Sequence, residues 1–539
     1  MKYLSYAARA PVAAGARSRH GVIMESTSDF DGANIISIDT VRETKLPVIR
    51  LGELAKNATD GERALLDAGV GIYQQCGRLV CPIVETVAAA KGRKTSVARL
   101  VEVDQYYLRD LLSRHALWRS HVTRENKTVP KDPPMDIAKT ILARVGEWEF
   151  PIVSGVISTP TMREDGSLLT TPGYDKDSGF ILFGPPDMPN IPPQPSRGDA
   201  LQAMALLEKL LVDFPLDDEM SKSVALSAFI TPIVRGAFPV APMHAFSATS
   251  AGSGKSYLAD VAAAIATGKE MPVIAAGKKE EETEKRLGAA LMVAQPLISI
   301  DNVTGDLGGE ALCQAVERPS LRMRILGLSK LAPIEARGTT FFATGNNLIV
   351  YGDMTRRVIT ARLDARLERP EYRVFKGDPV AKVQANRGAY IAAVLTICRA
   401  YFVAGRPKLA PRLASFEGWS DTVRSALIWL GKADPVESME LQRDLDPKHI
   451  ERCAMLTAWA DAIGVGDDRR LTLAKVFEVA KGHKDLHEAI QLVTSKKQGF
   501  DARSLGLWLR DHRGNVVGNR RFNSYTHSKG GSLWWIEEI

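Results

Sequence analysis

The sequence lacks any run of apolar residues that approaches the roughly 18 needed for a membrane-spanning helix. Internal repeats are absent as well. Hydrophobic residues make up 45% of the chain and charged residues 25%, which is typical of a soluble globular protein. We therefore expect a cytoplasmic protein that makes no use of a membrane.

Cysteine is scarce and its spacing fits no cofactor. The five cysteines are scattered along the chain, at Cys76, Cys81, Cys313, Cys398 and Cys453. The two that lie near each other have no second pair of Cys or His residues to complete a zinc site. This pattern excludes a disulfide scaffold and predicts reduced, mostly buried thiols.

Acidic residues are missing from the first twenty positions, MKYLSYAARAPVAAGARSRH, which carry several arginines. Such a composition resembles that of a transit peptide. We favour a disordered N-terminus over residues 1–42. The whole chain has a formal net charge of +7 and a pI near 9.0, which permits an anionic polymer as a partner.

A second catalytic acid is missing from the N-terminal part. A primase of the archaeo-eukaryotic kind needs an Asp-x-Asp strand and a partnered histidine, whereas Asp39 in IISIDT stands alone. Primase activity is therefore not predicted. Paired strands over 77–87 and 96–104 and a helix that follows them indicate a mixed α+β domain over 43–190, whose role the sequence leaves open.

At 539 residues the chain is too long for a single core. A proline-rich linker over 184–199 marks a domain boundary. Alternating strands and helices then predict a parallel α/β sheet in a domain over 191–365, with the linker and leading helices occupying 191–240. A helical region over 366–468 and a last small unit over 469–539 complete the organisation.

The segment that carries the clearest chemistry lies between an apolar run and a helix. It resembles the phosphate-loop pattern, Gly, four residues, then Gly-Lys-Ser/Thr. The eight residues are Thr249, Ser250, Ala251, Gly252, Ser253, Gly254, Lys255 and Ser256. Their small side chains let backbone N–H groups surround a phosphate at a helix N-terminus. Lys255 would then reach the β- and γ-phosphates of ATP, and Ser256 would hold Mg²⁺; the alternative is a chance Gly-Lys-Ser in a flexible turn.

Two later strands end in polar residues that suit the same chemistry. QPLISIDN ends in Asp301, which can hold Mg²⁺, and the next residue is Asn302, where many ATP-driven motors carry a second acid. An amide orients water but accepts no proton from it, so slow hydrolysis is one possible outcome. TTFFATGNN ends in Asn346 and Asn347, either of which could position the attacking water.

A pair of arginines, Arg356 and Arg357, follows in VYGDMTRRVITARLD. Adjacent arginines on a solvated strand usually carry no function. At this position in the order of motifs, they suit an arginine finger that reaches the nucleotide of a neighbouring subunit.

The order of Gly254-Lys255-Ser256, LISIDN, FFATGNN and GDMTRR resembles the superfamily 3 and poxvirus-type primase-helicase group of AAA+ ATPases, found in phages, plasmids and integrated elements. The resemblance covers roughly residues 200–465. The phrases EKRLGAALM and FEGWSDTVRSALIWLGKADP resemble prophage replication proteins described as DNA primase/helicase. Thr249 and Asn302 depart from the commonest pattern, which puts the rate in doubt rather than nucleotide binding.

The resemblance implies a ring, a homo-hexamer, with ATP at the subunit interfaces. It assigns Lys255 and Ser256 to the triphosphate and Mg²⁺, and Asp301 to Mg²⁺. It assigns Asn346 to sensing the nucleotide, and Arg356 or Arg357 to the γ-phosphate of a neighbour. Helicases of this group also carry a DNA-gripping hairpin between the second and third strands. SLRMRILGLSKLAPIEARG fits it, with Arg322, Arg324 and Lys330 as candidate DNA contacts and a solvated edge hairpin as the alternative.

Three predicted helices and two strands at the end of the chain suggest a winged helix. Its candidate DNA-binding arginines are Arg503, Arg510, Arg513, Arg520 and Arg521. Leu505, Leu507, Trp508 and Trp534 would form its core. Winged helices also bind proteins, so DNA is one of two possible partners.

Together these features predict an α/β protein: a P-loop AAA+ core with a mixed α+β N-terminal domain and a C-terminal winged helix. The expected function is an ATP-dependent DNA helicase or translocase, acting on single-stranded or forked DNA in the replication of a phage or other mobile element. Two alternatives stay open: an ATP-binding replication initiator that hydrolyses little, and an AAA+ remodeller of a protein partner.

Overall fold

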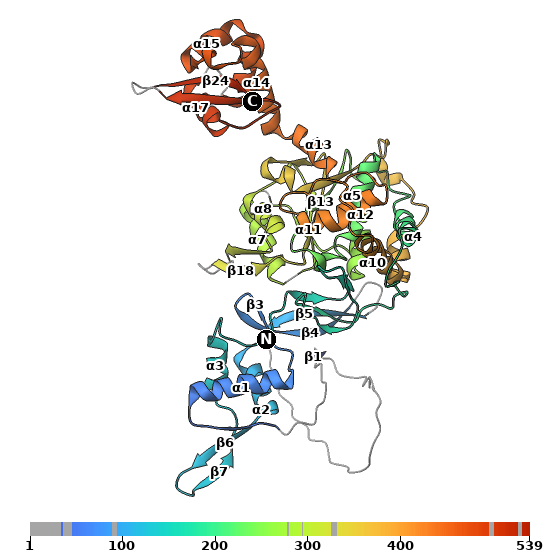
Figure 1. The fold of residues 1–539 in the computed structure, drawn as a ribbon, viewed down its shortest axis with the longest axis vertical. Coiled ribbons are helices and arrows are strands. Elements are labelled where there is room, and N and C mark those ends of the chain that lie inside the picture. The colour runs from blue at the N-terminus through green and yellow to red at the C-terminus, as the bar shows by residue number, and fades with distance from the viewer. Residues whose placement is uncertain are drawn as a thin grey trace.

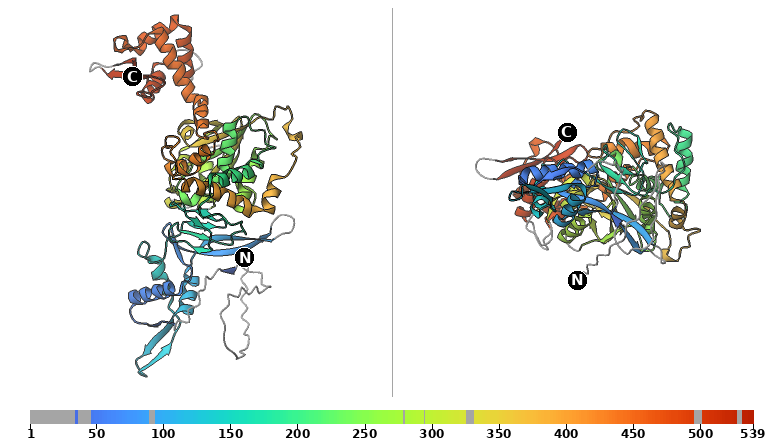
Figure 2. Two further views of the ribbon diagram at one scale, coloured as in Figure 1. Left: turned by 45° about the vertical axis from the view of Figure 1, so that its right-hand side comes forward. Right: turned by 90° about the horizontal axis from the view of Figure 1, so that it is seen from below.

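The computed structural model of the protein describes residues 34–35, 46–88, 94–277, 280–293, 295–324, 331–494, 501–526 and 531–539. Figures 1 and 2 show a central unit with the N-terminal part at one end and a C-terminal unit at the other. Three large clusters of buried apolar side chains correspond to these parts. Within the described segments, no helix has both the length and the apolar character required to cross a bilayer.

The N-terminal unit is built from three helices and a small sheet. Helices α1 (Leu54–Ala68), α2 (Gln105–His115) and α3 (Met135–Ala143) pack against one another over a common apolar core. The strands β2 (Val48–Arg50), β6 (Leu117–Val122) and β7 (Lys127–Pro130) form the sheet in the order β2-β6-β7. Asp104 begins α2 by accepting hydrogen bonds from the amides of Tyr106 and Tyr107.

The two strands predicted near residues 77–104 pair as expected. They are β4 (Arg78–Ala88) and β5 (Lys94–Glu102), which run antiparallel, with β3 (Tyr73–Gln75) on the free edge of β4. A short strand β1 (Asn34–Ile35) also pairs with β4. Because β1 falls within 1–42, that segment is not wholly unstructured; all of its other residues lie outside the described part of the chain.

Short strands beyond residue 150 contact both the N-terminal part and the central unit, which differs from the boundary expected at the proline-rich linker. Val153 and Ile181 share a small apolar cluster with Tyr73 and Val80. Strands β8 (Gly155–Ile157), β11 (Gly173–Tyr174) and β12 (Phe180–Leu182) form one sheet. Strands β9 (Thr161–Met162) and β10 (Leu168–Leu169) form a hairpin whose Met162 is buried in the central core. The reason is a close approach: a Cβ on Gly236 would lie 2.7 Å from the Met162 carbonyl oxygen.

The linker itself has no regular structure up to Ser196, which caps α4 (Arg197–Glu208) in a capping box with Asp199. Helix α5 (Glu219–Ile230) follows, capped by the side chain of Asp218. Both helices lie where the apolar spacing of the sequence predicts them.

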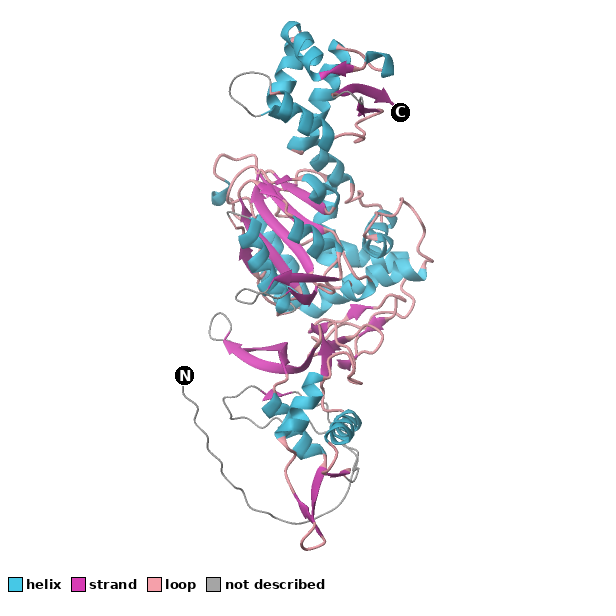
Figure 3. Cartoon of the chain, turned by 90° about the vertical axis from the view of Figure 1, so that its left-hand side faces the viewer, coloured by secondary structure: helices cyan, strands magenta, loops and turns pink. Residues whose placement is uncertain are grey.

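The centre of the molecule is a parallel sheet, which confirms the predicted α/β class. Its strand order is β14-β15-β19-β13-β21. The strands are β13 (Met243–Ala248), β14 (Val273–Ala275), β15 (Leu297–Val303), β19 (Thr340–Asn346) and β21 (Val358–Leu363). Every residue of β13 is buried, as expected for a parallel strand covered on both faces. Figure 3 shows helices on both sides of these strands.

The helices around the sheet include α6 (Lys255–Thr267), α7 (Glu280–Met292), α8 (Glu310–Glu317), α9 (Pro379–Ala385) and α10 (Arg387–Val403). Helix α6 is rich in alanine and largely buried, so it lies close to the sheet. Helix α13 (Glu437–Leu445) contacts β21 and leads toward the C-terminal unit.

The C-terminal unit begins earlier than position 469. Helix α14 (Pro447–Ala462) buries Met455 and Trp459 in the C-terminal core rather than in the central one. The remaining elements are β22 (Leu471–Thr472), α15 (Leu473–Gly482), α16 (Lys484–Thr494), α17 (Ala502–Asp511), β23 (Arg520–Thr526) and β24 (Ser532–Glu538). The sheet order is β22-β24-β23, all antiparallel.

The core expected for this unit is largely correct. Leu505 and Trp534 are buried, and Trp508 packs against the cluster while stacking on His512. Leu507 is an exception, because its side chain lies on the outer face of α17 and is 45% exposed.

A buried ion pair joins α8 to the start of β21. The Arg357 guanidinium, only 5% exposed, pairs with the Glu317 carboxylate, which also accepts a hydrogen bond from Ser415. Burial by itself would raise the pKa of Glu317, but Ser415 and Arg357 outweigh it and hold this pKa below 4.5.

Replacing Glu317 with Gln is expected to lower the free energy of unfolding by about 2 kcal/mol, because it leaves the buried Arg357 guanidinium with only the exposed Asp353 carboxylate, at 3.2 Å, as a counter-charge. Since the folded-state pKa of Glu317 is lowered, the stabilisation is present at neutral pH and is lost as the pH falls below about 4.5. Urea unfolding followed from pH 7 to pH 4 tests both points. An unchanged midpoint for Glu317→Gln at pH 7 would contradict them.

Candidate functional site

The loop predicted to bind phosphate joins the end of β13 to the start of α6. Gly252 and Gly254 have φ angles of 76° and 95°, in the left-handed region that glycine adopts without strain. A Cβ on Gly252 would also lie 2.8 Å from the backbone nitrogen of Glu371. Thr249, which replaces the first glycine of the pattern, is not among the residues with positive φ, so its backbone needs no glycine.

Lys255, the first residue of α6, lies between two of the predicted elements. Its ammonium donates to the Asn346 side-chain oxygen at 2.6 Å and to the Ser250 carbonyl oxygen at 3.1 Å. Burial lowers the pKa of Lys255, and the nearby Asp301 carboxylate partly opposes this effect. The structure therefore favours Asn346 over Asn347 as the residue that faces the loop.

Ser256 and Asp301 come together in the same place. The Ser256 hydroxyl donates to Asp301 Oδ1 at 3.3 Å, and the Thr344 hydroxyl donates to the same oxygen. A hydroxyl and a carboxylate are oxygen ligands that suit Mg²⁺, which commonly takes few protein ligands and completes its shell with phosphates and water. Among the described residues no three His, Cys, Asp or Glu side chains cluster as a metal cage, so an ion here would depend on those other oxygens.

A β-bulge interrupts the pairing of β15 with β19 at Asp301 and Asn302. Strand β15 pairs with β19 through Ile300 opposite Ala343 and then Val303 opposite Gly345, so one extra residue lies on β15. Asn302 has a φ of 52°, which asparagine tolerates better than most residues. Its amide donates to Thr344 Oγ1 at 3.2 Å. Bulges of this kind redirect side chains beside active sites.

Sequence reasoning missed Thr344. Its hydroxyl connects Asp301 to the Asn302 backbone, and this role depends on pairing between strands that lie about forty residues apart. The available signal was its position two residues before Asn346, on the same face of β19.

An aromatic cluster beside the loop was also missed. Phe214, Tyr257 and Phe375 contact one another with ring centroids 5.3–6.0 Å apart. A Cβ on Gly254 would lie 3.4 Å from the Phe375 ring. The Tyr257 hydroxyl donates to Asp378 at 2.6 Å, which fixes the segment that follows β21 against α6. The cluster forms an apolar wall next to the loop.

The two candidate finger arginines have different environments. Arg357 is buried in its pair with Glu317, so it is not available to a neighbouring subunit. Arg356 is 44% exposed, with only long contacts of 3.6–3.7 Å to Asp353 and Glu317. The backbone carbonyl oxygen of Arg357 accepts a hydrogen bond from the Met243 amide at the start of β13. The loop follows the other end of this strand, about 17 Å away. Arg356 therefore lies far from the loop of its own subunit.

No family model matches the chain, and no curated protein does. Among solved structures, the apo C-terminal region of NrS-1 is 11% identical over 88% of this chain and 98% of that chain, with a TM-score of 0.38. JCV helicase bound to an acetamide compound is 14% identical over 46% of this chain and 68% of that one, with a TM-score of 0.19. At these values the likeness carries no argument about function, which is inferred from the chain's own residues.

The predicted hairpin lies between β15 and β19, as expected. It consists of β17 (Ser320–Arg324) and β18 (Leu331–Glu335), paired antiparallel. Arg322 is exposed, and Arg324 is the last residue of β17. The turn, residues 325–330, lies outside the described residues, and Lys330 with it.

The arginines of the C-terminal unit form two groups. Arg503 and Arg510 are exposed on α17, and Arg513 is exposed just after it. Arg520 and Arg521 lie on β23, where they face Glu538 and Glu537 on β24 at 3.9 Å and 2.7 Å. The first group is therefore better placed than the second to meet an external anion.

Replacing Asn302 with Asp is expected to raise the turnover number for ATP hydrolysis by about tenfold. A carboxylate can accept a proton from the attacking water, although phosphoryl transfer depends more on positioning than on a base. Aspartate tolerates the left-handed backbone of this position nearly as well as asparagine. Phosphate release at saturating ATP measures the effect, and an unchanged or lower rate would show that the missing acid is supplied elsewhere.

Proposed function

We propose that the chain binds ATP with Mg²⁺ at the loop of residues 249–256 and hydrolyses it. The observation that carries the proposal is the meeting of Lys255 with Asn346 and of Ser256 with Asp301. These side chains come from the start of α6 and from the ends of the neighbouring strands β15 and β19. Ligands of parallel α/β sheets bind at the carboxyl ends of the strands.

Each residue has a role that its contacts support. Lys255 would exchange its bond to Asn346 for contacts with the β- and γ-phosphates, which leaves Asn346 to orient the attacking water. Ser256 and Asp301 would hold Mg²⁺, which neutralises charge on the transferred phosphoryl group. Thr344 would keep Asp301 in position. The wall of Phe214, Tyr257 and Phe375 offers an apolar surface for the base of the nucleotide.

The proposed assembly is a ring, a hexamer, in which Arg356 of one subunit contacts the γ-phosphate bound by the next. Support comes from the exposure of Arg356 and from its distance to its own loop. An arginine that completes the site from a neighbour would couple hydrolysis to movement between subunits.

The proposed activity is that of a DNA-dependent ATPase, acting as a helicase or translocase in the replication of a phage or other mobile element. The β17–β18 hairpin would contact a DNA strand through Arg322, Arg324 and Lys330. The C-terminal unit, in which three helices precede the β23–β24 hairpin, would act as a winged helix, and Arg503, Arg510 and Arg513 on its α17 side would contact phosphates.

Steady-state ATP hydrolysis with and without a single-stranded oligonucleotide tests the proposal. We expect stimulation by DNA of about tenfold or more that weakens as salt rises, because phosphate contacts release counterions. ATP binding without hydrolysis would favour the initiator, which Asn302 makes the stronger alternative. Hydrolysis indifferent to DNA would favour a remodeller whose C-terminal unit binds protein.

A further inference from the structure

A cavity lies well away from the loop. It has a volume of about 720 Å³ and is lined by residues that come just before β14, β15 and β19, including Pro272, Pro296 and Gly338. Strands β8 and β12 and the end of β5 close its other side. The end of α6 reaches this cavity at Thr267, whereas the start of α6 lies at the loop.

The lining is strongly cationic. Four basic side chains contribute to it, those of Arg99, Arg235, Lys269 and Arg387, against a single acid, Glu270. The formal excess of positive charge faces a partly open cavity whose walls are otherwise mostly apolar. Because low-dielectric walls strengthen such a field, the cavity attracts anions.

Two of these cations, the buried Arg235 and the half-buried Arg387, have no carboxylate partner among the described residues. Arg235 is 5% exposed and donates to the carbonyl oxygens of Thr339, Phe238 and Pro239. Burial lowers its pKa to about 9, and the neighbouring Arg337 adds to this effect. Its charge is therefore solvated by dipoles alone, which leaves it uncompensated.

Arg387 is held in a similar way at the end of α6. It donates to the carbonyl oxygens of Ile265 and Ala266 and to the Thr159 hydroxyl. Burial lowers its pKa to about 10. These bonds orient the guanidinium at the cavity wall, but they supply no negative charge beyond the partial charge of a helix C-terminus.

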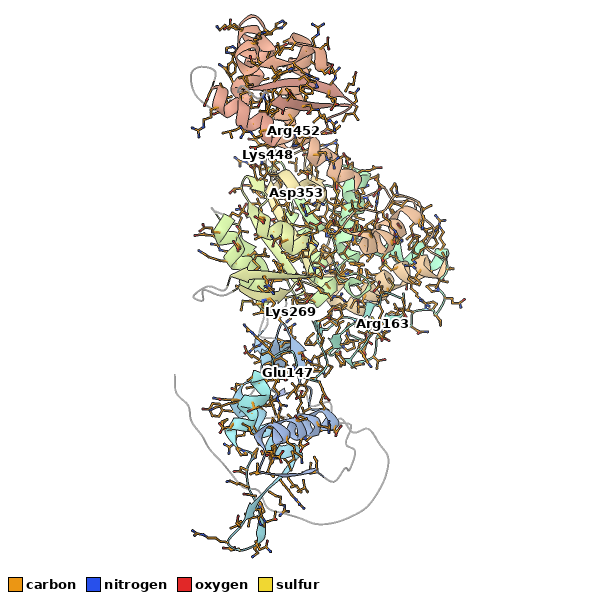
Figure 4. All side chains as sticks on the ribbon, turned by 60° about the vertical axis from the view of Figure 1, so that its left-hand side comes forward. Glu147, Arg163, Lys269, Asp353, Lys448 and Arg452 are labelled. Carbon is orange, nitrogen blue, oxygen red and sulfur yellow. The ribbon has the colours of Figure 1, made fainter. Side chains whose placement is uncertain are left out.

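Lys269 is the cation best placed to bind a ligand. Figure 4 shows it at the border of the central unit that faces the N-terminal part. Burial and then Arg387 lower its pKa, and among the described residues no hydrogen bond or ion pair is formed by its ammonium. An anion in the cavity would relieve the repulsion between Lys269 and Arg387.

The remaining walls suit a flat apolar group. Phe180 and Phe183 are among the lining residues, and Ile233, Leu297 and Leu100 are among the other apolar ones. The volume falls within the range of about 300–1,000 Å³ that is usual for sites of small organic ligands. A ligand that matches both the cationic and the apolar part of the lining carries an aromatic ring and one or two phosphates.

We propose that this cavity is a second ligand site, which binds a nucleoside mono- or diphosphate with its phosphates at Lys269 and Arg387. The base packs against Phe180 and Phe183. The site is separate from the loop that binds ATP in the proposed function and does not depend on it. Helix α6, 13 residues and about 20 Å long, runs from the loop to the cavity, so the two sites lie at opposite ends of one helix.

The test uses isothermal titration of the full-length chain carrying Lys255→Ala, with AMP as the probe. We expect one AMP per chain. Lys269→Glu is expected to weaken binding by about tenfold or more, because it removes one charge-assisted contact and introduces repulsion. Ser158→Trp, which places an indole ring at the cavity wall, is expected to weaken binding as well. Lys209→Glu, the same charge reversal at an exposed lysine outside the cavity, is expected to change nothing.

The other outcomes overturn the proposal. If AMP does not bind, the proposal is wrong. It is also wrong if AMP binds equally well to the Lys269→Glu and Ser158→Trp variants. Equal affinity for inorganic phosphate alone overturns the role of the aromatic wall. A short oligonucleotide that binds more tightly than AMP, with the same dependence on Lys269, identifies a strand end rather than a free nucleotide as the source. Because Lys255 is already replaced, failure of the ATP site leaves these results unaffected.

Discussion

Replacement of Lys255 by alanine is expected to lower the rate of ATP hydrolysis by about 10²–10³-fold. The loss reflects the removal of a positive charge aimed at the phosphates, comparable to the removal of other preorganised donors from active sites. Among the described residues, the Lys255 ammonium donates hydrogen bonds only to Asn346 and to the Ser250 carbonyl oxygen, so its loss removes little packing. Phosphate release at saturating ATP and Mg²⁺ measures the effect.

The control for this experiment is Lys209→Ala, which removes an exposed lysine after α4 and should leave hydrolysis unchanged. Circular dichroism of both variants confirms that the fold is retained. Hydrolysis by Lys255→Ala within twofold of wild type would remove the loop from the mechanism and with it the proposed ATPase.

Loss of Arg356 is expected to reduce hydrolysis by about 10³-fold while nucleotide binding changes little. An arginine finger stabilises charge that develops only in the transition state, and contributions of this size are usual for such residues. Because Arg356 is exposed and makes only long ion-pair contacts, Arg356→Ala should not destabilise the fold. Turnover and ADP affinity, measured on the same preparation, separate the two effects.

The matched control is Arg443→Ala, which removes an exposed arginine that pairs with Glu440 on α13. Its turnover should equal that of wild type. If Arg356→Ala also retains full turnover, the ring loses its proposed arginine finger, whereas a parallel loss of ADP affinity would indicate an effect on binding rather than on the transition state.

Much of the central unit follows from local patterns in the sequence. The apolar runs that become β13, β15 and β19 are continuous because parallel strands are buried on both faces, and each is followed by its polar residues at the same edge. That regularity made Lys255, Asp301 and Asn346 identifiable before their contacts were known.

The features that escaped prediction depend on pairs far apart in the chain. Arg357 looked as exposed as Arg356, and only its contact with Glu317, forty residues earlier, shows that it is buried. The bulge at Asn302 depends on the register with β19, which a single strand does not encode. The sequence of α14 has the same helical pattern as the rest of 366–468. Nothing in that pattern indicates that the helix packs into the C-terminal core.

The separation of Arg356 from the loop of its own subunit has a genetic consequence. In the proposed ring every nucleotide lies between a loop from one copy and an arginine from another. A copy that carries Arg356→Ala inactivates the site of its neighbour and keeps its own loop intact. A copy that carries Lys255→Ala inactivates its own loop and still supplies Arg356 to its neighbour. Either allele, expressed beside the wild type, should therefore be dominant, while the two together should restore part of the activity by complementation.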